Sequence, residues 1–244
     1  MHRFYIFSQN ILADKIVISD SQQAHYLRDV LRLKAKDPVI AFDEKGNEYS
    51  CLIEKVLPRA ITLHIKDIAR VKGQKEFSLT VACAIPKKSN MDDIIDKLTQ
   101  LGVDRIIPLK TKRVIVSLDE QKKELRLQRW RKIAQSASQQ CQRNALPIIE
   151  PIKDIKEVLF ESKDYDLKLI PTLSGKRKTL KEVLQNYRPL SILIFIGPEG
   201  DFTDEEINLA KLSGCLPVSL GNLVLRVETA AVAVASFIKL NEDS

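Results

Sequence analysis

Residues 191–206 read SILIFIGPEGDFTDEE, and this stretch decides the fold. Its first six residues carry no charge and are mostly apolar, which is typical of a parallel strand buried on both faces. The Gly-Pro-Glu-Gly turn that follows lets the backbone bend tightly and approach a ligand, although it would also fit a plain type II turn. Three acidic residues after Thr203 favour the start of a helix there. A strand, a turn and a helix in this order predict an α/β domain.

A second loop of the same kind occupies residues 219–230, SLGNLVLRVETA. It follows a short apolar strand and precedes an Ala- and Val-rich helix that we expect to be buried on most faces. Arg226 and Glu228 lie at the edge of this helix, and a buried charge needs a partner or a function. A structural ion pair of Arg226 with Glu228 or Glu199 would meet that need equally well. Two such loops at the carboxyl ends of consecutive strands predict a ligand site, because open α/β sheets bind ligands there.

The rest of the second half also alternates strands and helices. Strands are expected at 78–85, 104–109, 166–170, 191–196 and 216–220, and helices at 89–101, 118–143, 179–186, 203–212 and 228–240. This alternation predicts a mostly parallel sheet that is covered by helices on both faces.

The first part of the chain has a different pattern, in which short strands are separated by turns. Strands are expected at 3–7, 15–18, 38–43, 49–56 and 60–68, with a helix at 21–30. Apolar and polar residues alternate in two of these strands, as in a sheet with one buried face. The pattern predicts a small β-barrel domain over residues 1–72, followed after a polar connector by the α/β domain over residues 73–244.

The positive charge of the chain is concentrated in one segment. The 244 residues carry a net charge of +7, and residues 105–143 alone hold 11 basic and 3 acidic side chains. Such a stripe is the electrostatic footprint of a phosphate-binding surface and favours a nucleic-acid partner. A solvated helix face is the alternative. Trp130 lies within the stripe, where it would stack on a base or, as is commoner for such a position, pack in the core.

Several other classes of protein are disfavoured. The four cysteines are widely spaced, with no Cys-x-x-Cys pair, so we expect free thiols and no metal site. No apolar stretch is long enough to span a membrane, and the N-terminus lacks the features of a secretion signal, so a cytoplasmic protein is expected. The glycine patterns of dinucleotide-binding, P-loop and nucleophile-elbow proteins are missing, which disfavours ordinary dinucleotide enzymes and hydrolases.

An ordered set of motifs runs along nearly the whole chain. It comprises Arg3-Phe4-Tyr5, residues 25–33, residues 97–103 with Pro108, residues 140–143 with Pro147, residues 196–200 and residues 220–230. This set resembles the RsmE family, ribosomal small-subunit RNA methyltransferases of the SPOUT superfamily that modify a uridine at N3. The sequence departs from the family pattern at Lys36, Gln100, Gln139, Gln142, Asp201, Asn222, Leu223 and Val227. We assign no catalytic role at Gln100 or Gln139, where the family has Glu.

The resemblance implies a PUA-like β-barrel followed by a SPOUT domain, an α/β fold with a C-terminal deep trefoil knot. It also implies a homodimer that uses S-adenosylmethionine to methylate N3 of a uridine in 16S rRNA, uridine 1498 in the family, during maturation of the small ribosomal subunit. Three loops would bind the cofactor through Pro171, Thr172, Leu173, Gly197, Pro198, Glu199, Gly200, Leu220, Gly221, Leu225, Arg226 and Thr229.

Catalysis requires the loss of the uridine N3 proton, because the protonated nitrogen is a poor nucleophile. Arg226 is expected to stabilise the negative charge that develops on the uracil oxygens. Glu199 and Glu228 are candidates to orient Arg226 or to accept the proton, and the sequence does not rank them.

RNA contacts are expected from both domains, through side chains that bind phosphates without reading sequence. These are Arg3, His25, Arg28, Arg32, Lys87, Lys112, Arg113, Lys122, Lys123, Arg129, Arg131, Lys132, Gln140 and Arg143. Two other functions fit the same sequence. One is a SPOUT methyltransferase that acts on another RNA or on a ribose 2′-oxygen. The other is a non-catalytic RNA-binding protein in ribosome assembly that kept the fold.

Overall fold

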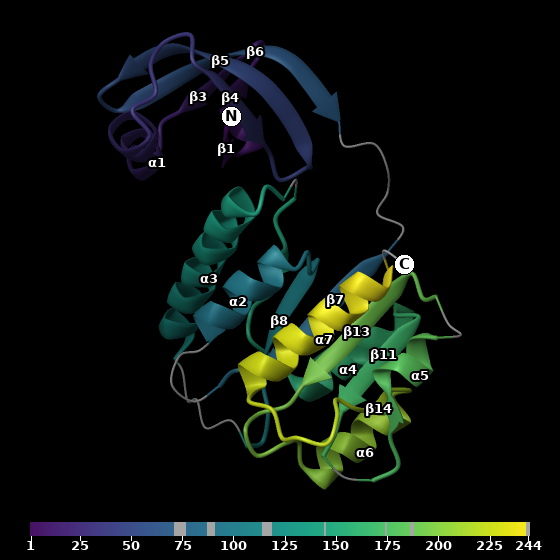
Figure 1. The fold of residues 1–244 in the computed structure, drawn as a ribbon. Helices are drawn as coiled ribbons and strands as arrows, with labels where there is room; N and C mark the ends of the chain where they lie inside the picture. The colour runs from purple at the N-terminus through teal and green to yellow at the C-terminus, as the bar shows by residue number, and fades with distance from the viewer. Residues whose placement is uncertain are drawn as a thin grey trace. The chain divides into compact units, whose positions relative to one another are not determined.

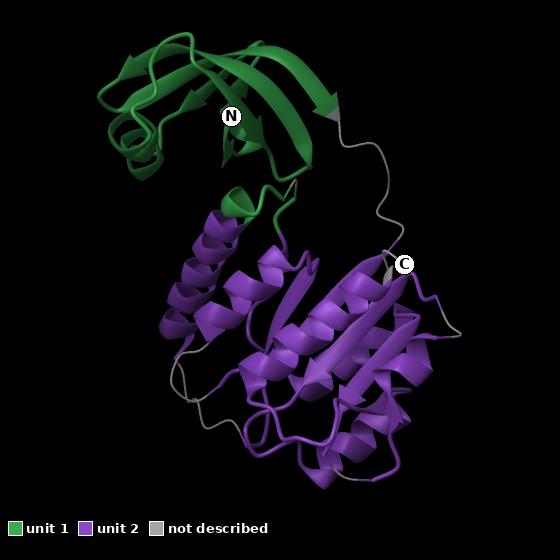
Figure 2. Cartoon of the chain, in the orientation of Figure 1, with its two compact units in different colours: residues 1–74, 138–146 green, residues 75–137, 147–244 purple. Residues whose placement is uncertain are grey.

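The structure is a computed structural model, and it describes residues 1–70, 77–86, 91–113, 119–143, 145–173, 175–185 and 188–242. The chain divides into two compact units (Figure 2). Residues 1–74 and 138–146 form the first unit, and residues 75–137 and 147–244 form the second. The sequence predicts a single boundary between residues 72 and 73, whereas the first unit also includes the short segment 138–146.

A curved six-stranded sheet forms most of the first unit, in the order β1-β4-β5-β6-β3-β2 (Figure 1). Its strands are β1 (His2–Tyr5), β2 (Ile11–Leu12), β3 (Lys15–Ile18), β4 (Pro38–Phe42), β5 (Asn47–Leu57) and β6 (Ala60–Arg70). β5 and β6 form a long antiparallel hairpin, and β1 pairs in parallel with β4. Alternate residues of the hairpin, such as Ile53, Ile61 and Leu63, are buried in one core.

The helix of the first unit begins at a capped residue. The Asp20 carboxylate accepts a hydrogen bond from the backbone N of Gln23 at 2.7 Å, and α1 (Ser21–His25) continues into a wider helical turn over Tyr26–Val30. Ala24 and Leu27 pack on the sheet core. This confirms the helical segment that the sequence predicts at 21–30.

The second unit contains an eight-stranded sheet in the order β10-β8-β7-β13-β11-β14-β12, with β9 beside β8. Its strands are β7 (Ser78–Ala84), β8 (Arg105–Lys110), β9 (Ile148–Ile149), β10 (Lys153–Asp154), β11 (Leu167–Pro171), β12 (Lys178–Thr179), β13 (Ser191–Ile196) and β14 (Leu216–Ser219). Every strand pair described for this sheet is parallel, which confirms the predicted class.

Helices cover both faces of this sheet. The helices are α2 (Met91–Gln100), α3 (Glu120–Gln140), α4 (Ile155–Glu161), α5 (Leu180–Leu184), α6 (Asp204–Leu212) and α7 (Val227–Glu242). Apolar residues of α2, α3, α5 and α7 share one core, and those of α4 and α6 share the other. In β13, Ile192 and Ile194 face the first core, and Leu193 and Phe195 face the second, as expected for a strand buried on both faces.

Helix α6 begins directly after the turn that follows β13. The Thr203 hydroxyl accepts a hydrogen bond from the backbone N of Glu206, and the Glu206 carboxylate accepts one from the backbone N of Thr203 at 2.8 Å. This capping box supplies partners for two groups at the helix start. The buried Glu206 carboxylate also accepts a hydrogen bond from the backbone N of Lys112 at 2.8 Å, which ties the end of β8 to α6.

Trp130 lies in the core of the second unit. It is 2% exposed, packs in the same core as α2 and donates a hydrogen bond from Nε1 to Asp92 Oδ1 at 3.1 Å. A tryptophan held in this way cannot stack on a nucleic-acid base, so the core interpretation is confirmed.

The cysteines are free thiols, as predicted: Cys51, Cys83 and Cys215 are buried, and Cys141 is partly exposed. Within the described residues, no group of three His, Cys, Asp or Glu side chains is placed to hold a metal ion. Nor does that part of the chain include a helix with the length and apolar character needed to cross a membrane.

Candidate functional site

Three loops meet where β11, β13 and β14 end, and they enclose a cavity. The cavity has a volume of about 600 Å³ including its open mouth, which is within the range of small-molecule sites. It is lined by Pro171, Thr172, Leu173, Arg177, Ile196, Gly197, Pro198, Glu199, Asp201, Leu220, Gly221, Leu223, Val224, Leu225, Val227 and Ala230. The two loops singled out from the sequence therefore share one site with the loop after β11.

Nine of the twelve residues that the resemblance assigns to the cofactor line this cavity. Gly200, Arg226 and Thr229 are not among the lining residues. The sequence pattern does not indicate Arg177, and it distinguishes Asp201 only as a departure from the family pattern. The residues around Arg177 include the basic run Lys176-Arg177-Lys178, and no motif distinguishes the one side chain that reaches the cavity.

The loop after β13 has little room for a side chain at its first residue. A Cβ added to Gly197 would lie 3.2 Å from the ring of Phe202, which is buried in the core beneath α6. The backbone N of Asp201 donates a hydrogen bond to the carbonyl of Pro198 at 2.9 Å and closes the turn. The Gly-Pro-Glu-Gly sequence thus brings the backbone to the wall of the cavity.

Asp201 connects two of the three loops. Its Oδ2 accepts a hydrogen bond from the backbone N of Leu173 at 2.9 Å, and its Oδ1 accepts one from the backbone N of Phe202 at 2.8 Å. Asp201 has φ +63°, in the left-handed region that favours glycine. Glycine would adopt this backbone conformation more easily than Asp201 does. The carboxylate, however, gains a hydrogen bond to the neighbouring loop.

The loop after β11 is fixed through Thr172. Its backbone N donates to the carbonyl of Val218 on β14 at 3.1 Å, and its carbonyl accepts a hydrogen bond from Arg177 Nη1 at 2.6 Å. Thr172 is buried, whereas the next residue, Leu173, is 51% exposed and forms part of the cavity wall. This part of the wall is thus the apolar side chain of Leu173. The backbone groups of Thr172 and Leu173 are held by hydrogen bonds and fix its position.

The loop after β14 turns at Gly221. This residue has φ +116°, which side-chain-bearing residues rarely adopt, and its backbone N donates to Ser219 Oγ at 3.2 Å. Leu223 and Val224 then follow, 78% and 73% exposed, and both line the cavity. Large apolar side chains in open solvent beside a cavity are typical of a binding surface.

The negative charges of two candidate catalytic carboxylates both affect the pKa of one buried thiol. Cys83, at the end of β7, is completely buried, and burial raises the pKa of its thiol. The negative charges of Glu228 and Glu199 raise this pKa further. Glu199 from one loop and Glu228 from the start of α7 therefore both lie within electrostatic reach of Cys83.

The expectation that Arg226 is a buried charge is wrong. Its side chain is exposed, and the burial begins one residue later, at Val227. The backbone carbonyl of Arg226 accepts the hydrogen bond of Ala230 at 2.8 Å, so Arg226 precedes the first turn of α7. The buried apolar face of α7 begins only at Val227, so the guanidinium of Arg226 is exposed to solvent.

Arg3 does not fit the role of an RNA contact. Its side chain is 11% exposed, its Nη1 lies 2.5 Å from Glu48 Oε2, and its guanidinium carbon lies 4.8 Å from the ring centre of Phe42. The charge of Arg3 is therefore paired within the first unit and little of it faces solvent.

The other basic candidates of the first unit are at the surface. Arg28 donates to both oxygens of Asp29, and this pairing, with a further hydrogen bond from His25, lowers the pKa of the Asp29 carboxyl to about 2. Arg28 Nη1 also donates to the carbonyl of Pro58 at 2.5 Å. Arg32 is exposed and has φ +54°.

The basic side chains of the stripe in the second unit have acidic partners, two of them one helical turn away in the sequence and one on another helix. Lys122 pairs with Asp119 at 3.0 Å and Lys123 with Glu120 at 2.6 Å, both across one turn of the chain. Arg129 reaches from α3 to Asp92 on α2 at 2.5 Å. Exposed pairs of this kind are weak, so these side chains remain able to bind a polyanion.

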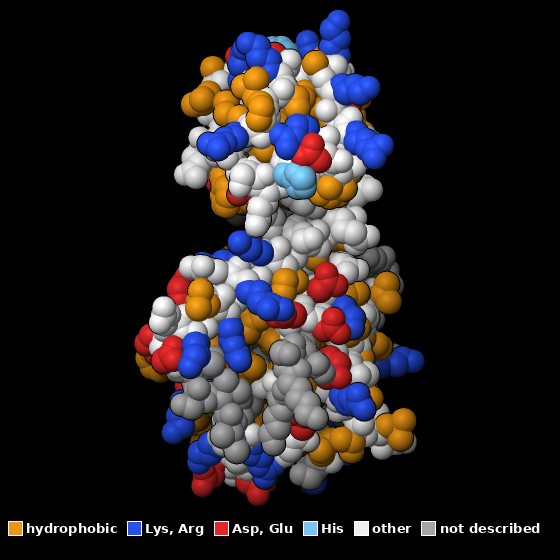
Figure 3. Space-filling view, turned by 90° about the vertical axis from the view of Figure 1, so that its left-hand side faces the viewer, with side chains coloured by type: hydrophobic (Ala, Val, Ile, Leu, Met, Phe, Trp, Pro, Cys, Tyr) orange, Lys and Arg blue, Asp and Glu red, His pale blue; other side chains and the backbone are white. Residues whose placement is uncertain are grey.

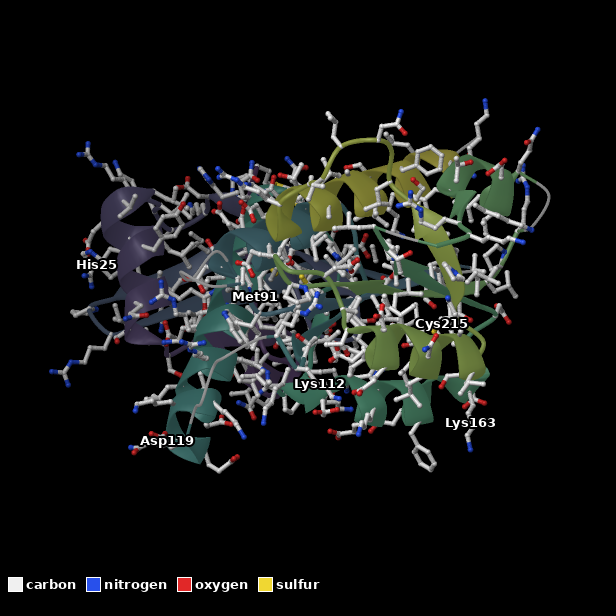
Figure 4. The ribbon with its side chains drawn as sticks, turned by 90° about the horizontal axis from the view of Figure 1, so that it is seen from below. His25, Met91, Lys112, Asp119, Lys163 and Cys215 are labelled. Carbon is white, nitrogen blue, oxygen red and sulfur yellow. The ribbon has the colours of Figure 1, made fainter. Side chains whose placement is uncertain are left out.

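Two further candidates connect the end of β8 to the site. The side chain of Lys112, which is labelled in Figure 4, pairs through Nζ with Glu205 at the start of α6. This pairing raises the pKa of Lys112 and lowers that of Glu205. Arg113 Nη1 donates to the carbonyl of Gly200. These contacts give both side chains a role in supporting the loop after β13.

The remaining candidates lie along α3 and after it. Lys132, Arg131 and Gln140 are exposed, and Arg143 is partly buried. Lys87 lies outside the described residues. Figure 3 views the side of the molecule that carries α3, and Lys and Arg side chains there are interspersed with Asp and Glu.

Comparison with known proteins identifies the family. Residues 73–239 match the RNA methyltransferase domain family, and residues 18–70 match the RNA methyltransferase PUA domain family. A protein named ribosomal RNA small subunit methyltransferase E from Rickettsia conorii is 30% identical over 98% of this chain and 95% of its own length. One of the same name from Synechocystis is 31% identical over 99% of this chain and 78% of its own. This chain belongs to the ribosomal RNA small subunit methyltransferase E family.

Solved structures agree with the family. A methyltransferase from Legionella pneumophila, in complex with the bound cofactor S-adenosylmethionine, is 30% identical with a TM-score of 0.87, over 98% of this chain and 96% of that one. The family member from Neisseria gonorrhoeae, bound to S-adenosylmethionine, is 27% identical with a TM-score of 0.84, over 98% and 97%. Both units of the present chain thus have counterparts in the family, a PUA domain and an RNA methyltransferase domain.

Proposed function

We propose that the protein transfers a methyl group from S-adenosylmethionine to N3 of a uridine in 16S rRNA, during maturation of the small ribosomal subunit. The observation that carries this proposal is the single cavity formed by the loops after β11, β13 and β14. A relative named ribosomal RNA small subunit methyltransferase E and similar solved structures that hold this cofactor support the proposal.

The cavity suits this cofactor. Apolar side chains, among them Leu173, Leu220 and Leu225, provide surfaces for a purine ring, and the close approach of the Gly197 backbone supplies polar groups without side-chain bulk. Glu199 and Asp201 line the cavity and match the two positive charges of the cofactor, on its sulfonium and its ammonium group. S-Adenosylmethionine has no phosphate, which is consistent with a site built without a Gly-rich phosphate loop.

The residues around the cavity divide the chemical work between them. The cofactor supplies a methyl group that its sulfonium has already activated. Arg226 donates hydrogen bonds to the uracil oxygens and stabilises the negative charge that develops there. Glu199 or Glu228 accepts the proton of uridine N3, and the charges of both carboxylates reach the buried Cys83 thiol. The uridine has to leave its stack to reach this site.

The experiment that tests the function is methyl transfer to purified small ribosomal subunits that lack the modification. We expect incorporation of one methyl group, which mapping of the product would place on a uracil N3. A methyl group on a ribose 2′-oxygen would instead support a related methyltransferase with another target atom. Binding of RNA with no transfer, by protein that binds the cofactor, would favour a non-catalytic assembly factor.

Three finer features belong to the same proposal: a trefoil knot, a homodimer and a cytoplasmic location. The knot is proposed from the family resemblance, and α7, which follows the loop after β14, packs on α2 and β7. The exposed Leu223, Val224 and Leu240 support a homodimer, because association would cover them. The cytoplasmic location follows from the proposed ribosomal substrate.

The basic stripe of α3 should contribute to RNA affinity through phosphates. Replacing Lys122, Lys123, Arg129 and Lys132 together by Gln should weaken RNA binding and flatten the dependence of log K on log salt by about 0.7–0.9 for each phosphate that is no longer neutralised. Filter binding at several salt concentrations measures both quantities. The matched control replaces four exposed lysines elsewhere in the second unit by Gln, namely Lys156, Lys163, Lys181 and Lys211. Equal slopes for the two variants would show that the stripe makes no specific contribution.

Asp201 should shape the cofactor site at little expense to folding. Asp201→Gly removes the hydrogen bonds to Leu173 and Phe202, at a cost of about 1 kcal/mol each, but relieves about 1–2 kcal/mol of strain in the left-handed backbone. We therefore expect a melting temperature close to that of the unaltered protein and a several-fold weaker affinity for S-adenosylmethionine. Thermal unfolding and calorimetric titration measure the two. An unchanged affinity would mean that the bond does not hold the Leu173 wall.

A further inference from the structure

The charged residues that line the cavity include more acidic than basic side chains. Glu199 and Asp201 are acidic, and Arg177 is the one basic residue among the described residues of the lining. S-Adenosylmethionine carries three charges, a positive sulfonium, a positive ammonium and a negative carboxylate. Two acidic residues and one basic residue are the complement of these three groups, because opposite charges must meet for a desolvated ligand to bind.

Arg177 is held where it can meet a ligand. Its Nη1 donates to the carbonyl of Thr172 at 2.6 Å, and Thr172 is itself bonded to Val218 on β14 at 3.1 Å. A guanidinium has five N–H donors in a planar fork, and this anchor uses one edge of it. The anchor therefore limits the rotation of a long side chain and lowers the entropy lost when a ligand is bound.

We propose that Arg177 binds the carboxylate of the aminoacyl end of S-adenosylmethionine, an inference that rests on the proposed function. The guanidinium fork matches the geometry of a carboxylate and forms paired, charge-assisted hydrogen bonds with it. Arg177 thereby sets the direction in which the aminoacyl chain leaves the adenine pocket. It also makes the site selective for the complete amino acid over adenosine thioethers that lack the carboxylate.

The test compares three ligands on three proteins by calorimetric titration. The ligands are S-adenosylmethionine, its decarboxylated form and 5′-methylthioadenosine, which lacks the whole aminoacyl end. The proteins are the unaltered chain, Arg177→Gln, and Lys176→Gln as the matched control. Lys176 is an exposed cation one residue away that does not line the cavity, so its loss reports the general effect of charge.

We expect Arg177→Gln to weaken S-adenosylmethionine about 10- to 100-fold, the usual effect of losing a charge-assisted hydrogen bond. The same variant should bind the decarboxylated cofactor and 5′-methylthioadenosine as the unaltered protein does. Lys176→Gln should bind all three ligands normally. Arg177→Lys should recover part of the affinity, because it restores the charge but not the fork.

Two results would overturn the inference while leaving the proposed function intact. One is an unchanged affinity of Arg177→Gln for S-adenosylmethionine. The other is an equal loss for all three ligands, which would mean that Arg177 serves only to hold the Thr172 loop. If the unaltered protein binds neither S-adenosylmethionine nor 5′-methylthioadenosine, the proposed function fails, and the role of Arg177 fails with it.

Discussion

Arg226→Ala should lower the rate of methyl transfer about 100- to 1000-fold, the usual effect of removing one hydrogen-bond donor from a developing oxyanion. Its affinity for S-adenosylmethionine should change less than about twofold. The reason lies in its position, since Arg226 is exposed beside the cavity and is not among the residues that line it. Single-turnover transfer to RNA measures the rate, and calorimetric titration measures the affinity.

The control for this variant is Lys211→Ala, which removes one positive charge from an exposed position on α6. It should transfer methyl groups at the normal rate, which would exclude a general effect of charge on RNA binding. Equal losses of rate and of cofactor affinity in Arg226→Ala would remove the catalytic assignment and leave a structural one.

Trp130→Ala should have the largest effect on stability. The side chain is almost completely buried between α3 and α2, and truncating such a residue costs about 3–5 kcal/mol of unfolding free energy. For a chain of this size each kcal/mol lowers the melting temperature by about 2–4 °C. Circular dichroism during urea unfolding is the suitable measurement, because the variant removes the chain's one tryptophan and with it the fluorescence signal.

Trp130→Phe separates packing from hydrogen bonding. It keeps most of the apolar contact but leaves Asp92 Oδ1 without the indole N–H donor, so a smaller loss of about 1–2 kcal/mol is expected. If Trp130→Ala unfolds at the same urea concentration as the unaltered protein, the side chain does not support the α2–α3 layer.

The sequence predicts the regular elements where the pattern is long enough to be specific. The six uncharged residues of β13 and the alternation in β5 and β6 identified buried strands of both kinds. Helix α4, with seven residues, and two-residue strands such as β9 offer less than two periods of any pattern. Their formation depends on neighbours far away in sequence, which a local pattern does not contain.

The candidate site was predictable where the backbone carries the function. Gly197 and Gly221 are needed for close approach and for a positive φ, and glycine is visible in a sequence. The contributions of Arg177 and Asp201 depend on side-chain contacts between loops, and neither has a local signature. The apolar residues that follow Arg226 predict that it is buried. It lies before the first turn of α7, however, and the buried face of this helix begins one residue later.

Because three of the four cysteines are buried, a thiol reagent should react with only one cysteine of the folded protein. Burial raises the pKa of Cys51 and of Cys215 to about 12 and that of Cys83 further, and thiolates are the form that reacts. Cys141 is partly exposed and lies in segment 138–146 of the first unit. A maleimide dye added to the folded, unaltered protein should therefore attach at one position. That single label would give a fluorescent reporter of RNA binding without any cysteine having to be removed.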